Sequence, residues 1–157
     1  HSPDLIIILI GSSGESDYVK TVSASFMSDE KVKDVSGKTN LAQLIELLRA
    51  TDLLITNDTG PMHLASSLKT DVLALFGPCS PQQYGFGANV KTIYKNAYCS
   101  PCVHEFVVPP CKGDNQCMKL ISVDEVFEAF LDYENFVSFT PIQFNSSPNQ
   151  TLGTVKR

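Results

Sequence analysis

The sequence predicts an α/β fold in which parallel strands alternate with helices. Three short apolar runs, at residues 5–10, 53–56 and 72–76, are bounded by polar or turn residues, as expected of buried strands. Segments with helical periodicity separate these runs, and strands joined by helices form parallel sheets through right-handed crossovers. We therefore expect a Rossmann-like three-layer sandwich, in which ligands bind at the carboxyl ends of the strands.

The amino-terminal elements are the least regular. After the strand at residues 5–10, the Gly-Ser-Ser-Gly stretch at 11–14 predicts a loop. A helix with a weak apolar face is expected from Glu15 to about Phe26, and a short strand at residues 34–35. The loop at 36–40 would then lie at the same sheet edge as the loop at 11–15.

The middle of the chain has the clearest pattern. Asn40 and Gln43 have the spacing of a capping box, followed by apolar residues at i, i+3, i+4 and i+7. Those four positions are Leu41, Leu44, Ile45 and Leu48. They predict a helix with one face toward a core, followed by a strand at 53–56, a helix at 62–68 and a strand at 72–76.

A further strand is expected at residues 90–94, after a loop rich in Gly and Pro. Ser122 and Glu125 form a second capping box, and a five-position apolar stripe follows at Val123, Val126, Phe127, Phe130 and Leu131. Beyond residue 135 the pattern ends in Ser, Asn, Thr and Pro. We expect one domain at residues 1–137 and an irregular tail at 138–157.

Composition excludes some classes of protein. The 157 residues are 43% hydrophobic and 18% charged, as in ordinary globular domains, and carry a net charge of −5. Lys and Arg form no cluster, which argues against a nucleic-acid partner. The longest apolar run, at 5–10, is too short to span a bilayer, and no secretory signal precedes it. We expect a cytoplasmic protein.

The turn at residues 57–63 is the most informative motif. It joins the strand at 53–56 to a helix whose first position suits Pro61 and whose cap suits Thr59. The N–H groups of Gly60, Met62 and His63 would then be unpaired donors at a positive helix end, a natural seat for phosphate. Asp58 and His63 add an acceptor and a titratable ring. The alternative is an ordinary strand–turn–helix, since these are common turn residues.

The longer pattern around this turn resembles a known family. Residues 35–68 read VSGKTNLAQLIELLRATDLLITNDTGPMHLASSL, and VLALFGP follows at 72–78. With the cysteine-bearing stretch at 99–117 and ISVDEV at 121–126, they resemble the heptosyltransferases of glycosyltransferase family 9, over about residues 4–131. The resemblance implies an inverting glycosyltransferase that transfers heptose from ADP-heptose to a lipopolysaccharide core acceptor.

Family members have a two-domain GT-B architecture, and this chain resembles only the carboxyl-terminal, nucleotide-sugar-binding half. It is expected to begin at the second strand of that half, without the amino-terminal domain that holds the catalytic base and the lipid-linked acceptor. No catalytic residue is therefore expected here, and the isolated domain should be inactive. The full-length protein would work at the inner face of the inner membrane. Two alternatives are another GT-B enzyme, such as a nucleotide-sugar epimerase, and a non-catalytic nucleotide- or sugar-binding module.

The resemblance also implies residue roles. Asp58 matches an aspartate that contacts hydroxyls of the transferred sugar, while Thr59, Gly60 and the neighbouring amides of Met62 and His63 match the diphosphate site. Fixed N–H groups there would stabilise the charge of the departing nucleoside diphosphate, so no cofactor is required for the chemistry.

Two more loops are implied in donor binding. Glu15 matches a glutamate assigned to the ribose, and a carboxylate at a strand end can accept from both ribose hydroxyls. The equally weighted alternative is a glutamate that favours the dipole of the following helix. Lys38 and Thr39 lie where the family has its base pocket, although their polarity does not identify the base.

Cys99, Cys102, Cys111 and Cys117 form the pattern C-x2-C-x8-C-x5-C in a loop rich in Pro. Four thiols so spaced can enclose a structural zinc ion, and the alternative is reduced packing thiols or adventitious disulfides. Cys79 follows Gly77 and Pro78 near the ligand edge and is interpreted as a small loop residue.

Overall fold

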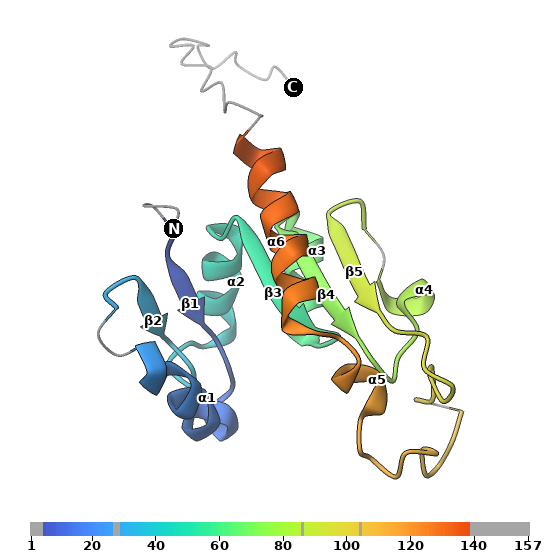
Figure 1. The fold of residues 1–157 in the computed structure, drawn as a ribbon. Helices are drawn as coiled ribbons and strands as arrows, with labels where there is room; N and C mark the ends of the chain where they lie inside the picture. The colour runs from blue at the N-terminus through green and yellow to red at the C-terminus, as the bar shows by residue number, and fades with distance from the viewer. Residues whose placement is uncertain (1–4, 27–28, 86, 104, 139–157) are drawn as a thin grey trace, which may run out of the picture.

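A computed structural model describes residues 5–26, 29–85, 87–103 and 105–138. Within them, five strands form two sheets in which every pair is parallel: β1 (Ile7–Leu9) with β2 (Val32–Asp34), and β3 (Leu53–Asn57), β4 (Asp71–Phe76) and β5 (Val90–Tyr94) in that order. The predicted α/β fold with parallel strands is confirmed (Figure 1).

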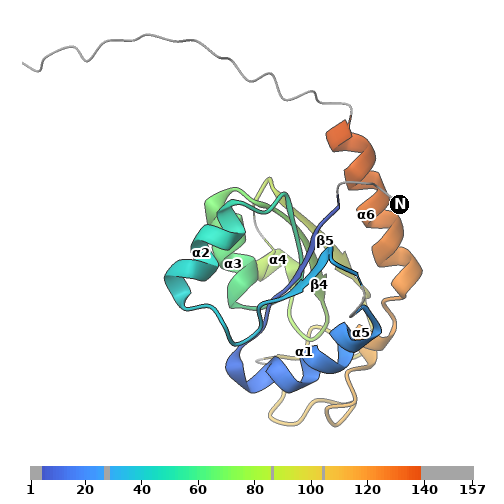
Figure 2. The same ribbon diagram turned by 90° about the vertical axis from the view of Figure 1, so that its left-hand side faces the viewer.

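Helices cover both faces of the three-stranded sheet. The described helices are α1 (Ser16–Ser23), α2 (Leu41–Arg49), α3 (Gly60–Leu68), α4 (Pro81–Tyr84), α5 (Gln116–Lys119) and α6 (Val123–Ser138), with 3-10 turns at Ser13–Glu15 and Ala24–Phe26. Figure 2 shows α2 and α3 on one side of the sheet and α6 on the other, the expected three layers.

The larger hydrophobic core lies between the sheet and the layer of α2 and α3. Its buried members are Leu48, Leu54, Met62, Ala65, Val72, Ala74 and Phe76. Phe76 is fully buried, and Ile10, which follows β1, packs against the same cluster. Apolar burial of this extent is the main force that holds the layers together. The smaller core, Leu73, Ile93 and Ala129, attaches α6 to the opposite face of the sheet.

The capping box predicted for α2 is confirmed. The side chain of Asn40 accepts from the N–H of Gln43, and that of Gln43 accepts from the N–H of Asn40, each at 2.9 Å. The predicted apolar stripe is only partly buried. Leu48 is 1% exposed and Leu44 packs against the core, but Leu41 is 63% exposed.

The first strand differs from the expectation of a fully buried run. β1 is only three residues long, and Ile6, Ile7 and Ile8 are 64%, 45% and 38% exposed. Within the described residues β1 pairs with β2 alone, and no backbone ladder joins it to β3. On the other side of this break, Ile55 of β3 is 44% exposed. The apolar composition of β1 is therefore that of an inner strand, while its surroundings are those of an edge.

The last helix begins as predicted, with Ser122 Oγ accepting from the N–H of Glu125 at 3.1 Å. The Glu125 carboxylate forms an ion pair with Lys95, with Oε2 2.8 Å from Nζ. Of the predicted stripe, Val126 packs against the smaller core, whereas Val123 and Phe127 are 84% and 56% exposed. The predicted tail, from residue 139 onward, lies outside the described residues.

No helix in the described part of the chain is both long enough and apolar enough to cross a membrane.

Candidate functional site

The parallel register brings the strand ends together at one edge of the sheet. Asn57 at the end of β3 pairs with Leu75 of β4, and Phe76 at the end of β4 pairs with Tyr94 of β5. The turns after β3 and β4 are therefore neighbours, at the edge where open α/β sheets bind ligands.

The turn after β3 leads directly into α3. The helix begins at Gly60, one residue earlier than expected, so Pro61 is the second helical residue and Thr59 is the N-cap. The side chain of Thr59 makes no capping hydrogen bond, contrary to the prediction. Its Oγ1 instead lies 3.3 Å from Oγ1 of Thr56 and donates to the carbonyl oxygen of Asn57 at 3.3 Å. The Thr59 hydroxyl therefore makes its hydrogen bonds within the turn, and no side chain caps the helix end.

One of the three predicted backbone donors is occupied. The N–H of Met62 donates to the carbonyl oxygen of Thr59 at 3.0 Å, and the Met62 side chain is 1% exposed in the core. Met62 therefore anchors the helix and offers no open donor. Gly60 is different, because its N–H precedes the first helical hydrogen bond and a Cβ built on it would meet no heavy atom within 4 Å. The space in front of α3 is open at Gly60.

Asp58 is held from both sides. Its carboxylate is 14% exposed, and Oδ1 lies 3.5 Å from Nε2 of His63 one helical turn along, which forms an ion pair when the ring is protonated. The thiol of Cys79, after β4, donates a hydrogen bond to the same carboxylate. Burial, together with this bond to Asp58, raises the pKa of Cys79 to about 11, so the thiol stays protonated and remains a donor.

Cys79 is a candidate site residue that the sequence alone does not distinguish from a small loop residue. The sequence signal that could have indicated Cys79 is its position just after the strand that neighbours β3. Gly77 and Pro78 directly follow β4 and Asn57 ends the neighbouring β3, so the parallel register places Cys79 beside Asp58.

Glu15 lies in the 3-10 turn after β1. Its Oε2 accepts from the N–H of Ser12 at 2.8 Å and from Ser12 Oγ at 2.7 Å, and these bonds lower the pKa of the carboxyl group. The geometry is that of a local capping box. The carboxylate nevertheless remains exposed at the sheet edge.

The loops at 11–15 and 36–39 touch each other. The N–H of Gly37 donates to the carbonyl oxygen of Gly11 at 2.9 Å, and a Cβ on Gly37, whose φ is +67°, would lie 3.0 Å from Cα of Ser13. Only glycine accommodates both the φ and this approach. Lys38 Nζ donates to the carbonyl oxygen of Asp34 at 2.7 Å, and Thr39 is half-buried. Among the described residues, no hydrogen bond joins these two loops to the Asp58 turn.

The cysteine loop does not support a zinc site, one of the two alternatives given above for its four thiols. Within the described ranges, no group of three or more His, Cys, Asp or Glu side chains is arranged to hold a metal ion. Cys99, Cys102 and Cys117 are buried, Cys111 is half-buried, and all four are free thiols.

The same loop packs on the connection after β4 that carries Cys79. The N–H groups of Cys102 and Val103 both donate to the carbonyl oxygen of Pro78, at 2.8 and 3.0 Å. A Cβ on Gly77 would lie 2.5 Å from Sδ of Met118, so a side chain at this position would displace the Met118 side chain. The cysteine loop thus supports the segment that positions the thiol beside Asp58.

These features define a class of protein. A parallel α/β sheet with flanking helices carries, at its carboxyl edge, an open helix N-terminus beside a restrained carboxylate, the arrangement of α/β domains that bind phosphorylated ligands.

Comparison with known proteins identifies the family. The profile of Glycosyltransferase family 9 (heptosyltransferase) matches residues 4–110, and the chain belongs to this family. It is 36% identical over 103 residues to lipooligosaccharide heptosyltransferase 2 of Campylobacter jejuni. The aligned residues are 62% of this chain and 30% of that protein. It is 32% identical over 77 residues to lipopolysaccharide heptosyltransferase 2 of Salmonella typhimurium, over 48% of this chain and 22% of that protein.

Solved structures agree on the fold. A family 9 glycosyltransferase from Veillonella parvula superposes with a TM-score of 0.67 at 26% identity, covering 86% of this chain and 37% of that one. The Escherichia coli ADP-heptose lipopolysaccharide heptosyltransferase II superposes with a TM-score of 0.63 at 23% identity. The superposition covers 83% of this chain and 37% of that one. The matched part of the chain spans 22–37% of the length of these relatives.

Proposed function

We propose that this chain is the nucleotide-sugar-binding part of an inverting glycosyltransferase that transfers heptose from ADP-heptose to a lipopolysaccharide core acceptor. The observation that carries the proposal is the Asp58 carboxylate, held by Cys79 and His63 directly beside the open N-terminus of α3. Membership of glycosyltransferase family 9 and the names of the relatives support the same activity.

Each part of the turn has a role in this proposal. As the glycosidic bond breaks, negative charge collects on the departing diphosphate, and the N–H of Gly60 with the positive end of α3 stabilises that charge. Asp58 accepts hydrogen bonds from hydroxyls of the sugar, and Thr59 shapes the turn around the phosphates. His63, which is 50% exposed, lies at the rim, where it can reach the ligand as well as Asp58.

The nucleoside would extend toward the neighbouring loops. Glu15 accepts from the ribose by exchanging its Ser12 contacts for ribose hydroxyls, and Lys38 and Thr39 border the base. The charge stabilisation comes from the helix end, so the proposed transfer requires no cofactor for its chemistry.

The remaining functions belong to the rest of an enzyme of the relatives' size. The catalytic base and the lipid-linked acceptor site would lie in an amino-terminal domain, and the complete enzyme would act peripherally at the cytoplasmic face of the inner membrane. The 157-residue chain, with its domain at 1–137, is then expected to bind the donor without turning it over.

A thermal-shift titration of the chain with ADP, UDP, GDP and ADP-heptose tests donor binding. A ligand at 100 times its dissociation constant adds about 2.7 kcal/mol to the free energy of unfolding. We expect ADP-heptose to stabilise most and ADP next. If none of the four ligands raises the melting temperature at millimolar concentration, the proposed site is wrong.

The Asp58→Asn variant tests the division of roles. We expect it to weaken ADP-heptose binding and to leave ADP binding nearly unchanged, because the carboxylate is assigned to the sugar. Asp124→Asn, on the first turn of α6 across the sheet, is the matched control and should change neither affinity. An equal loss of affinity for ADP and ADP-heptose would show that Asp58 contacts the nucleotide and not the sugar.

A further inference from the structure

The two sheets turn open edges toward each other. Figure 1 shows β1 between β2 and β3, and β3 is the edge strand of the order β3-β4-β5. On the β2 side, the N–H of Ile7 donates to the carbonyl oxygen of Lys31 at 2.9 Å. Backbone groups of a strand alternate in direction, so the N–H and C=O groups of Ile8 point away from β2, where no ladder lies among the described residues. A row of such groups is a template for a further strand.

The order of the strands identifies the position that is open. From β1 the chain steps to β2, away from β3, whereas the steps from β3 to β4 and β5 run in the opposite direction (Figure 1). A doubly wound sheet is built in this way, outward from a central first strand in the order third, second, first, fourth, fifth and sixth. Here β2 and β1 correspond to the third and second strands of that order, and β3, β4 and β5 to the last three. The position between β1 and β3 is that of the first strand.

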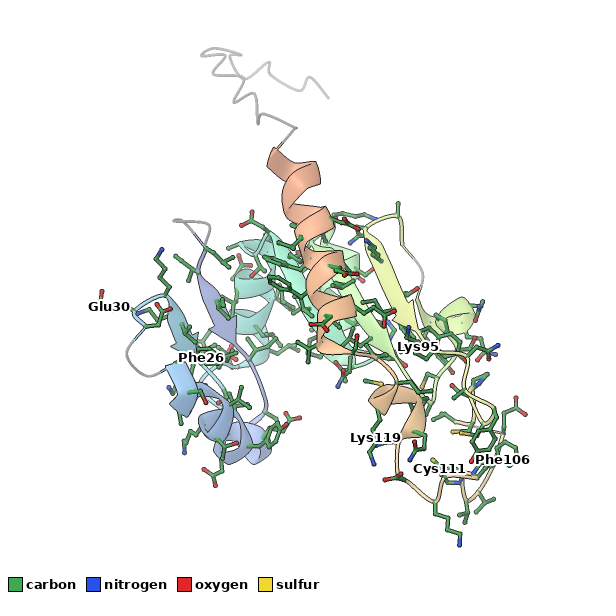
Figure 3. All side chains as sticks on the ribbon, in the orientation of Figure 1. Phe26, Glu30, Lys95, Phe106, Cys111 and Lys119 are labelled. Atoms are coloured by element: carbon green, nitrogen blue, oxygen red, sulfur yellow. The ribbon has the colours of Figure 1, made fainter. Side chains whose placement is uncertain are left out.

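One flank of α6 is apolar and exposed. Its three side chains, spaced four residues apart and therefore on one side of the helix, are Val123, Phe127 and Leu131, at 84%, 56% and 39% exposure. The opposite flank is attached to β5. There Nζ of Lys95 lies 2.8 Å from Oε2 of Glu125, and Nζ of Lys91 lies 3.6 Å from Oδ2 of Asp132. Figure 3 shows Lys95 on one side of α6 and Phe26, in the connection from β1 to β2, on the other. The apolar flank therefore faces away from β5, across β3 and toward β1.

The strands below this flank expose apolar side chains on the same side of the sheet. Leu53 packs against the smaller core beside α6, so Ile55, two residues further along β3, lies on the same face and is 44% exposed. Ile10 packs against the larger core, on the side of α2 and α3, so Ile7 lies on the side of α6 and is 45% exposed. We call this set of exposed apolar residues the open face: Ile7, Ile55, Val123, Phe127 and Leu131. A collection of large apolar side chains on one face marks an interaction site.

We propose that the open position takes a strand–helix unit: an apolar strand that pairs in parallel with both β1 and β3, followed by an amphipathic helix that covers the open face beside α6. The step from the new strand to β1 runs opposite to the step from β3 to β4. Since both connections are right-handed, the new helix lies on the face opposite α3, which is the face of α6 (Figure 2).

The position specifies the chemistry of this unit. A central strand with helices on both sides is rich in Val and Ile on both of its faces. The helix needs one apolar stripe, directed toward the open face, and a polar side toward solvent. The unit joins the amino-terminal side of β1, and the relatives contain chain outside the matched 22–37% of their length.

A second copy of this chain fits the position less well. Copies related by a twofold axis present the same edge to each other, so the paired strands run antiparallel. Such a contact would occupy the edge of β1 or the edge of β3, and would leave the other edge open.

The test compares the 157-residue chain with two fusions that extend it before residue 1. The first extension is a strand of about five Val and Ile residues followed by an amphipathic helix of about twelve residues. The control extension has the same helix and length but carries Pro at two strand positions, because Pro cannot donate to a ladder. The first extension should raise the melting temperature and slow amide exchange at Ile8 by about tenfold or more, as expected when several backbone hydrogen bonds form. The control should do neither, and the amides of β4 report in each protein that the domain itself is folded.

Variants of the open face test where the helix lies. Ile55→Lys and Phe127→Lys should change the melting temperature of the 157-residue chain little, because both side chains are exposed, and should remove the stabilisation gained in the first fusion. Val107→Lys, at an exposed position of the cysteine loop, is the matched control and should have no effect in either protein.

Three outcomes would overturn the proposal. The first is a first fusion with β4 intact and no protection at Ile8, and the second is an equal effect of the Lys substitutions with and without the extension. The third does not depend on the design of the extension: light scattering that finds the 157-residue chain to be a dimer, which Ile7→Lys dissociates, would assign the open edge to a second copy.

Discussion

Replacing Gly60 with Val changes the space in front of α3 without changing what holds the helix. A Cβ at this position meets no heavy atom within 4 Å, and the φ of Gly60 is not in the left-handed region, so neither a clash nor backbone strain is introduced. The free energy of unfolding should therefore stay within about 1 kcal/mol of the wild type, because replacing glycine also restricts the unfolded chain.

The effect on ligand binding should be much larger. If the diphosphate contacts the N–H of Gly60, a branched side chain will keep it at a distance and remove a hydrogen bond to a charged group. Such a bond contributes about 1.5–3 kcal/mol, which corresponds to a loss of about 10- to 150-fold in affinity for ADP. Isothermal titration calorimetry on the folded variant measures this loss directly.

Ala42→Val is the matched control, since it adds a branched side chain to the exposed first turn of α2. It should leave ADP affinity unchanged. A folded Gly60→Val protein that binds ADP as the wild type does would refute the assignment of the phosphate to this helix end.

Three further predictions concern stability. Leu48→Ala should lower the free energy of unfolding, measured by urea denaturation, by about 2–5 kcal/mol because Leu48 is 1% exposed. Leu41→Ala in the same helix, at 63% exposure, should change it by no more than about 0.5 kcal/mol. Equal losses for the two variants would contradict the observed orientation of α2. Asn40→Ala removes the N-cap of α2 and should lower the free energy of unfolding by about 1 kcal/mol. An unchanged free energy of unfolding would contradict the capping box. The pKa of Glu15 is lowered in the folded state, so its contribution is present above the ordinary glutamate pKa of 4.5 and is lost as the pH falls through the folded value. Glu15→Gln should therefore flatten the acid limb of the stability profile, and an unchanged profile would refute the Ser12 contacts.

Much of the fold follows from local chemistry and was predictable. The Asn40–Gln43 box, the apolar run of β4 and the strand at 90–94 each depend on residues within a few positions of one another, and all are found as expected. The exposure of β1 was not predictable, because its isoleucines specify an inner strand, whereas among the described strands only β2 pairs with it.

In the candidate site, too, features set by neighbouring residues were predictable and features set by tertiary structure were not. The Asp58 turn at a strand–helix junction is where the sequence placed it. The occupied N–H of Met62 and the unused cap of Thr59 depend on how the first turn of α3 is wound, which residue types do not specify. The thiol of Cys79 reaches Asp58 only through the register of β3 against β4, a contact between residues about twenty positions apart in the chain.

The break between the two sheets has a consequence for folding cooperativity. No residue in 5–26 or 29–35 is buried, so β1, α1 and β2 share little of the apolar contact that makes β3, β4 and α3 a single unit. Regions with few buried contacts open at a lower free energy than the rest of a domain. In native-state hydrogen exchange, the amides of β1 and β2 should exchange through such local opening, while those of β4 exchange only on global unfolding. The carboxyl-terminal sheet would therefore retain the Asp58 turn intact even while the loop carrying Glu15 is open.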